Sequence, residues 1–383
     1  MQVYLDHNAT SPLRPKAREA VLAALPAGNA SSVHGVGRAA RARVETAREQ
    51  VSALVGADPR AVTFTSGATE SIALALSPAM EIDGRPVAFD VLLVSGVEHP
   101  AVRAGGRFAA DRVEIVPVDA DGVVDLVALA ARMTGRRALV SVMAANNETG
   151  AIEPVRAVAD LVHGTGGVFH CDAVQIVGRV PFDLENSGAD LISISSHKFG
   201  GPQGAGALIA RNDDIRIPPL LRGGGQERGH RAGTENVAAV AGFGTAADEA
   251  RRNGATESAR VAALRDRLEA GIRATAPDVT ILSGGAARLP NTTCFAAPGI
   301  AAETAVIAFD LEGVAVSAGS ACSSGKVGPS QALAAMQVPP EVARGAVRAS
   351  LGWNSTEADV DRFLEVWARV HAALTERRAT KAA

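Results

Sequence analysis

The sequence predicts an α/β fold with a mostly parallel central sheet flanked by helices and with a smaller α+β domain. The first observation behind this prediction is that five apolar, β-rich runs are each followed at once by polar residues. The second is a helical pattern between such runs, as in residues 155–162. Unbroken apolar runs separated by helices are typical of parallel strands that are buried on both faces.

The five runs lead into clusters of residues that can carry chemistry. In chain order, residues 62–65 are followed by Ser66 to Glu70, residues 91–96 by Glu98 and His99, and residues 138–144 by Asn146 to Glu148. Residues 167–172 are followed by Ala173 to Gln175. The fifth run and its cluster form the segment 192–202, which contains Lys198. In parallel sheets of this kind ligands bind beyond the carboxyl ends of the strands. We therefore expect the five clusters to converge on one site.

The chain is long enough, at 383 residues, for two domains and a substantial core. We predict a large domain at residues 15–250 that holds this site, and a small α+β domain made of residues 1–14 and 251–383. Periodic Arg and Glu residues predict a linking helix over 247–274, in which Asn253 and Gly254 would permit a break.

Lys198 is the most informative single residue, because it follows an apolar stretch and is surrounded by hydroxyls, a histidine and glycines. A lysine is a hydrated cation at neutral pH, and it becomes a nucleophile only when burial or a cofactor lowers its proton affinity. An isolated lysine is usually a surface residue. At the end of a buried strand, beside four other polar clusters, Lys198 instead indicates an amine presented for Schiff-base chemistry.

The polar clusters fit pyridoxal phosphate better than any other cofactor. Asp172, at the end of a predicted buried strand, could pair with a protonated pyridine nitrogen and make the ring an electron sink. Its alternative role is a helix N-cap. His99 could lie on the ring and move protons, or it could be a structural histidine.

A phosphate site is predicted at residues 66–71, where small residues open a helix. The backbone N–H groups and the dipole of such a helix can receive a phosphate. Thr69, Ser195 and His197 would add side-chain donors to that site.

Ten stretches, in order along almost the whole chain, resemble those of one enzyme family. They are YLDHNATSP (4–12), GNASSVHGVGR (28–38), FTSGATES (64–71), VEHPAV (97–102), NNETG (146–150), HCDAVQ (170–175), SSHKFGGPQGAGAL (195–208), GGGQERGHRAGTEN (223–236), GSACSSG (319–325) and VRASLG (347–352). The chain thus resembles the class V, fold-type I pyridoxal phosphate enzymes, and within them the cysteine desulfurases of the NifS/IscS type.

The resemblance implies a role for each candidate cofactor residue. Lys198 would bind the cofactor covalently, Asp172 would pair with its pyridine nitrogen, and Gln175 would bond its phenolic oxygen. His99 would stack on the ring, and Asn147 would contact both cofactor and substrate. The residues that would line the phosphate are Ala68, Thr69, Ser195, Ser196 and His197.

Two further residues are implied to act on the phosphate and on the substrate. Thr234 would reach the phosphate from the partner subunit of a homodimer. Arg348 would clamp the substrate carboxylate, a task for which its planar guanidinium is suited. The alternative for Arg348, a surface arginine on a strand, is weakened by its apolar neighbours.

Cys322 decides the reaction within this superfamily. It lies in a Gly- and Ser-rich segment, residues 316–330, without helical or strand periodicity, as expected of a loop that can travel. The resemblance implies a thiolate that attacks the sulfur of bound L-cysteine and leaves L-alanine and a persulfide on Cys322. The sulfur would pass to an acceptor protein, such as a scaffold for iron–sulfur cluster assembly, or into another thio-cofactor pathway.

Three other functions remain open at this point. A selenocysteine lyase would depend less on the loop thiol. A class V aminotransferase would need a keto-acid acceptor and would not need Cys322. A catalytically silent interaction partner would keep the fold as a platform, but the full set of site residues argues against it.

The other cysteines and the composition indicate the setting. Cys171 should point away from the cofactor by strand alternation, and Cys294 has the pattern of a small core residue. Three cysteines without metal spacing predict neither a disulfide framework nor a metal site. A net charge of −3 argues against direct nucleic-acid binding. No apolar run approaches the roughly 20 residues of a membrane helix, so we expect a cytoplasmic protein.

Overall fold

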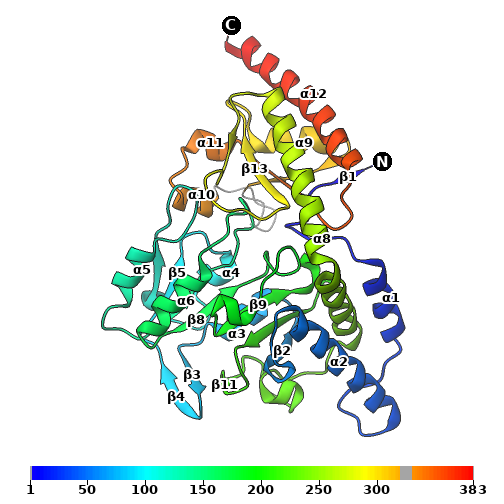
Figure 1. Ribbon diagram of the computed structural model, residues 1–383, viewed down its shortest axis with the longest axis vertical. Coiled ribbons are helices and arrows are strands. Elements are labelled where there is room, and N and C mark those ends of the chain that lie inside the picture. The colour runs from blue at the N-terminus through cyan, green and yellow to red at the C-terminus, as the bar shows by residue number, and fades with distance from the viewer. Residues whose placement is uncertain (1, 320–329, 383) are drawn as a thin grey trace.

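The computed structural model describes residues 2–319 and 330–382 (Figure 1). A seven-stranded sheet forms the lower half of the molecule in this view, in the order β2-β10-β9-β8-β7-β5-β6. Its strands are β2 (Val62–Thr65), β5 (Val91–Ser95), β6 (Val113–Val116), β7 (Ala138–Ser141), β8 (Val168–Asp172), β9 (Leu191–Ser195) and β10 (Gly206–Ala210). All five predicted runs form strands of this sheet, and the predicted α/β class is confirmed.

The strands that precede the polar clusters all point in one direction. β9, β8, β7, β5 and β6 are parallel neighbours. β10 is antiparallel both to β2 and to β9, so β2 runs in the same direction as β9. The carboxyl ends of the five predicted strands therefore meet at one end of the sheet, as expected.

Helices cover both faces of this sheet. The α-helices of this part of the chain are α1 (Pro15–Ala24), α2 (Gly35–Leu54), α3 (Ala68–Ala75), α4 (Pro100–Arg103), α5 (Leu126–Met133), α6 (Val155–Gly164), α7 (Leu184–Ser187) and α8 (Val237–Thr275). Val91 and Leu93 of β5 pack into the core that contains α2, α6 and the start of α8. Leu92 and Val94 pack into a second core with α3. Strand alternation thus buries both faces, which explains the unbroken apolar runs.

A small three-stranded sheet, in the order β11-β3-β4, lies beside the central sheet. β3 (Ala79–Ile82) and β4 (Arg85–Ala88) form a hairpin that pairs with β11 (Ile215–Arg216). The hairpin packs on the α3 side of the central sheet, because Met80 belongs to the same core as α3.

A second sheet forms the upper part of the molecule in Figure 1. It is antiparallel, in the order β12-β13-β16-β15, and a parallel pair of β1 and β14 accompanies it. The elements are β1 (Val3–Tyr4), β12 (Thr280–Ile281), β13 (Thr292–Ala296), β14 (Val314–Ala315), β15 (Ser317–Ala318), β16 (Ala346–Ser350), α9 (Ala302–Leu311), α10 (Gln331–Ala335), α11 (Pro340–Arg344) and α12 (Glu357–Ala382). Its core is built on aromatic rings, with Phe295 and Trp367 in edge contact and Phe309 stacked on Phe363.

Helix α8 joins the two parts. It has 39 residues and runs through Asn253 and Gly254, so it begins earlier than predicted and does not break there. Its first part, to Ala250, packs into the core of the central sheet, and residues from Val261 onward pack into the core of the second sheet. The division of the chain at residue 250 stays a prediction. None of the helices in the described residues has both the length and the apolar character needed to cross a membrane.

Candidate active site

A cavity of about 650 Å³ lies at the carboxyl ends of the central strands. Its volume is within the roughly 300–1,000 Å³ typical of small-molecule sites. The predicted site residues that line it are Ala68, Thr69, His99, Asn147, Asp172, Gln175, Ser195, His197 and Lys198. The convergence expected from the sequence is therefore observed, since these residues come from all five predicted clusters.

Lys198 ends a short 3₁₀ turn, Ser196–Lys198, that follows β9 directly. Its Nζ donates hydrogen bonds to the carbonyl oxygens of Asn8, at 2.7 Å, and Ala9, at 2.9 Å. The amine is half-buried and forms part of the cavity wall. The loop before α1 thus holds the lysine at the cavity.

Asp172 is the last residue of β8 and is buried in the cavity wall. Its Oδ1 accepts a hydrogen bond from the Val174 N–H at 3.0 Å. The next α-helix begins only at Leu184, so the helix N-cap alternative is wrong. Burial raises the pKa of Asp172 to about 6, while the Lys198 cation acts in the opposite direction. A carboxylate held in this way is suited to pair with a cationic group in the cavity.

The turn before α3 borders open space in the cavity. A Cβ added at Gly67 would meet no atom within 4 Å, whereas one added at Gly206 would come within 2.7 Å of the Gly67 backbone. β10 therefore supports the turn from one side, and the N-terminus of α3 faces open space. His197, also in the cavity wall, is fixed by a 3.1 Å hydrogen bond between its Nδ1 and the Thr10 hydroxyl.

His99 is held at the start of α4. Its Nδ1 accepts a hydrogen bond from the Ala101 N–H at 3.1 Å, so the proton of the neutral ring is on Nε2. Burial, with the nearby Lys198 cation, lowers the pKa of His99 to about 4. The ring is therefore neutral at physiological pH and can act as a donor through Nε2.

Gln175 is oriented by two neighbours. Its Nε2 donates to the Asn8 carbonyl at 3.1 Å, and its Oε1 accepts from the Arg179 guanidinium. Arg179 is half-buried, and desolvation lowers its pKa to about 9. The Gln175 amide is thus fixed at the cavity wall by the same carbonyl that holds Lys198.

Three predicted site residues lie outside the cavity lining. Arg348, on β16, is buried and donates to the backbone oxygen of Asn147 at 3.0 Å, so it lies directly behind a lining residue. Thr234 is exposed in the loop before α8. Ser196 is fully buried, and its Oγ would be 2.1 Å from a Cβ at Gly201, which places the hydroxyl against that glycine. Cys322, the remaining predicted site residue, lies outside the described residues.

The two other cysteines are where the sequence predicts. Cys171 is completely buried in the core that contains α2 and α6, and Cys294 is completely buried beneath α10. Burial raises the pKa of both thiols. Both are free cysteines, and neither thiol has the lowered pKa that marks a reactive cysteine.

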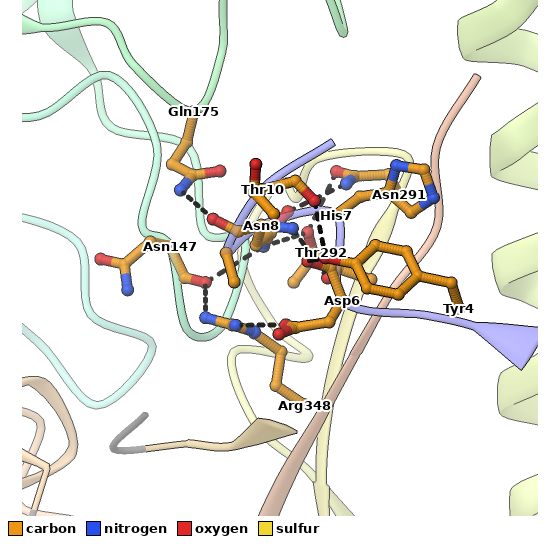
Figure 2. A network of polar contacts seen from close by, with 12 residues as sticks. Tyr4, Asp6, His7, Asn8, Thr10, Asn147, Gln175, Asn291, Thr292 and Arg348 are labelled. Atoms are coloured by element: carbon orange, nitrogen blue, oxygen red, sulfur yellow. Dashed lines mark hydrogen bonds and ion pairs between the residues drawn. The ribbon is translucent and has the colours of Figure 1, made fainter. Parts of the chain in front are cut away.

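Residues 6–10 are part of the site, although their sequence suggests no role for them beyond the resemblance of the YLDHNATSP stretch. Asp6 pairs with Arg348, and Asn8 contacts Gln175 and Asn147 (Figure 2). The Asn8 carbonyl also accepts a hydrogen bond from Lys198. Ala9 and Thr10 line the cavity. The turn is closed by the Tyr4 hydroxyl, which donates to the carbonyl oxygens of Asp6 and Thr10.

Comparison with known proteins agrees with this geometry. The family model described as Aminotransferase class-V matches residues 3–363. A cysteine desulfurase of Cereibacter sphaeroides is 45% identical over 372 residues, covering 95% of this chain and 94% of the relative. The cysteine desulfurase NifS of Azotobacter vinelandii is 41% identical over 368 residues, covering 94% and 90%. The solved NifS-like protein of Rickettsia africae has a TM-score of 0.87 at 33% identity, covering 97% of this chain and 100% of that one. As predicted from its sequence, the chain belongs to the class V aminotransferase family.

Proposed function

We infer that the chain is a cysteine desulfurase, the activity for which the relatives above are named. The structural observation that best supports this function is that the Lys198 amine and the buried Asp172 carboxylate both lie in the wall of one cavity. Similarity over nearly the full length confirms the predicted activity, and the roles of individual residues are proposals.

We propose pyridoxal phosphate as the cofactor of this cavity. The residues fit it: an amine for its aldehyde, a buried carboxylate for its pyridine nitrogen, and open space at Gly67 for its phosphate. Bound there, the cofactor would supply an electron sink for the electrons released at the substrate Cα. Asp172, Gln175 and His99 would hold the ring. Ala68, Thr69, Ser195 and His197 would surround the phosphate, with the α3 N-terminus contributing backbone N–H groups.

Lys198 would also handle the proton at the substrate Cα. An amine that has been released from the cofactor can accept that proton, and the carbonyl oxygens of Asn8 and Ala9 can then hold the resulting ammonium. His99, neutral and protonated on Nε2, would donate a hydrogen bond rather than carry a charge. The charge changes of the reaction would therefore centre on Lys198.

The substrate carboxylate would be bound by Arg348, whose Nη1 donates to the Asn147 carbonyl, and Asn147 would contact both substrate and cofactor. The Cys322 thiolate would form an S–S bond to the substrate sulfur while the substrate Cβ–S bond breaks. The electron pair of that bond would stay with the carbon fragment, which takes up protons and leaves as L-alanine. A persulfide would remain on Cys322.

The partners follow the same proposal. Thr234 is exposed, as required of a residue that reaches the site of a second subunit, and Arg231 in its loop pairs at 2.9 Å with Glu70 of the cavity lining. We propose a homodimer, a sulfur-acceptor protein such as an iron–sulfur scaffold, and a cytoplasmic location. The free, buried thiols of Cys171 and Cys294 support a reducing compartment.

The test is release of sulfide and L-alanine from L-cysteine with a reductant, for the wild type, Cys322→Ala and the control Cys171→Ala. Equimolar products that are lost only in Cys322→Ala would support the proposal. Full turnover by Cys322→Ala would contradict the role of that thiol. Products only from selenocysteine would indicate a lyase, and dependence on a keto acid would indicate an aminotransferase.

A further inference from the structure

Arg348 is anchored at both terminal nitrogens of its guanidinium. Nη2 donates to Oδ1 of Asp6 at 2.6 Å, and Nη1 donates to the Asn147 carbonyl at 3.0 Å (Figure 2). A planar guanidinium that is held at two nitrogens cannot rotate without breaking one of these bonds. These two bonds therefore constrain the orientation of the guanidinium plane.

Asp6 is itself fixed relative to the strand that carries Arg348. Its neighbours bond to Ser350 of β16: the Ser350 N–H donates to the Leu5 carbonyl at 2.8 Å, and the His7 N–H donates to the Ser350 carbonyl at 3.1 Å. The Asp6 carbonyl accepts from the N–H of Ala9 at 3.0 Å. The carboxylate thus projects from a rigid turn that is attached directly to β16.

The charges also favour a positioning role for Asp6. Arg348 is only 1% exposed on its side chain, and Asp6 is 18% exposed. A buried guanidinium without an anion would be strongly unfavourable, and it would move toward another anion or toward water. Asp6 is the carboxylate that bonds directly to this cation, on the opposite terminal nitrogen from the Asn147 carbonyl.

We propose that Asp6 is a positioning residue that determines how Arg348 recognises the α-carboxylate of the amino-acid substrate. This inference rests on the proposed role of Arg348. In addition, selectivity for a free carboxylate would depend on Asp6, which lies 342 positions before Arg348 in the chain. Asp6 contacts no reacting atom and acts only through the guanidinium.

The test compares L-cysteine with L-cysteinamide, which lacks the carboxylate, on the cofactor-loaded enzyme. In Asp6→Ala we expect KM for L-cysteine to rise about tenfold with little change in kcat, and in Asp6→Asn, which keeps an acceptor for Nη2, about threefold. The KM of L-cysteinamide, or its inhibition constant if it only competes, should change less than about twofold in either variant. Calorimetric binding of L-alanine should weaken in parallel with L-cysteine.

The matched control is Glu269→Ala, which removes a pair of similar burial, Arg288 with Glu269 at 2.7 Å, away from the cavity. It should leave both substrates unchanged. Equal losses for L-cysteine and L-cysteinamide in the Asp6 variants, or no loss for either, would overturn the proposal; if Asp6→Ala does not fold, Asp6→Asn decides it. Retained preference for L-cysteine in Arg348→Ala would instead refute the role of Arg348, and absence of desulfurase activity in the wild type would refute the function.

Discussion

The ammonium of Lys198 donates a 2.7 Å hydrogen bond to the carbonyl of Asn8, a residue 190 positions earlier in the chain. The same carbonyl accepts a hydrogen bond from Gln175. The Asn8 side chain, in turn, donates to the Asn147 carbonyl at 3.0 Å and to the Thr292 hydroxyl at 2.9 Å (Figure 2). Asn8 therefore connects Lys198, which follows β9 of the central sheet, to β13 of the second sheet.

Two adjacent threonines of β13 test this connection. The Thr292 hydroxyl accepts from Asn8 and donates to Asn291 Oδ1 at 3.0 Å, so Thr292→Val leaves two buried polar groups short of a partner. We expect a loss of about 1–3 kcal/mol in the free energy of unfolding, measured by urea denaturation, together with lower desulfurase activity.

Thr293 supplies the matched control. Its Oγ1 is buried and makes no hydrogen bond to any residue that the structure describes. Thr293→Val should therefore be neutral or more stable by up to about 1 kcal/mol. Similar effects of the two substitutions would show that the Asn8 contacts do not contribute.

The central site was predictable from sequence because its residues follow strands. Asp172 and Lys198 each end an apolar run, and parallel strands bring such ends together whatever their distance along the chain. The β3–β4 hairpin was not predicted, although Asp83 and Gly84 form an Asp-Gly turn with positive φ at both residues, which is a strong hairpin signal.

The role of residues 6–10 could not be predicted from local pattern. Asp6 pairs with Arg348, and no periodicity or propensity relates two positions so far apart. The continuous α8 was missed for a different reason, because Asn253 and Gly254 are weak helix formers whose cost is outweighed by packing at both ends of the helix.

Glu153 makes stability depend on pH. Its Oε2 accepts from the Val124 N–H at 2.9 Å, and burial raises the pKa of Glu153 to about 8. The folded chain thus holds a proton that the unfolded chain releases near its ordinary value of 4.5. The stabilisation from Glu153 is complete below that value and is lost as the pH rises to about 8.

Glu153→Gln should remove this loss, because glutamine is neutral at every pH. Between about pH 5 and pH 8.5 the free energy of unfolding should fall by about 1–3 kcal/mol less in the variant than in the wild type. Glu114→Gln is the control, since the Arg136 partner lowers the pKa of that carboxylate. An identical pH dependence in the wild type and Glu153→Gln would exclude a raised pKa.

His99 should stay neutral over the range in which histidines usually titrate. Burial and the Lys198 cation lower its pKa to about 4. In ¹⁵N-histidine NMR spectra of the enzyme, the His99 signals should therefore keep the Nε2–H pattern from about pH 8 down to about pH 5.5. Titration of these signals near pH 6.5 would contradict this environment and would restore His99 as a candidate general base.

Asp172→Asn separates the structural role of Asp172 from its proposed cofactor role. The asparagine Oδ1 can still accept the hydrogen bond from the Val174 N–H, so the turn should be preserved. In the cofactor-free protein, burial raises the pKa of the wild-type carboxyl to about 6, and stability present below the ordinary value is lost as the pH rises through 6. The variant should therefore be the more heat-stable protein at about pH 8, and the two should be similar near pH 4.

With the cofactor bound, the order of the two proteins should reverse for activity, and Asp172→Asn should be less active than the wild type. An amide cannot neutralise a protonated pyridine nitrogen, so kcat for sulfide release should fall about a hundredfold or more, while Lys198 still binds the cofactor and retains its visible absorbance. This combination of preserved fold, preserved absorbance and lost turnover is specific to a charge partner of the cofactor. If Asp172→Asn kept full activity, Asp172 would be a structural turn residue, and the cationic end of the ligand would have to be sought elsewhere in the cavity.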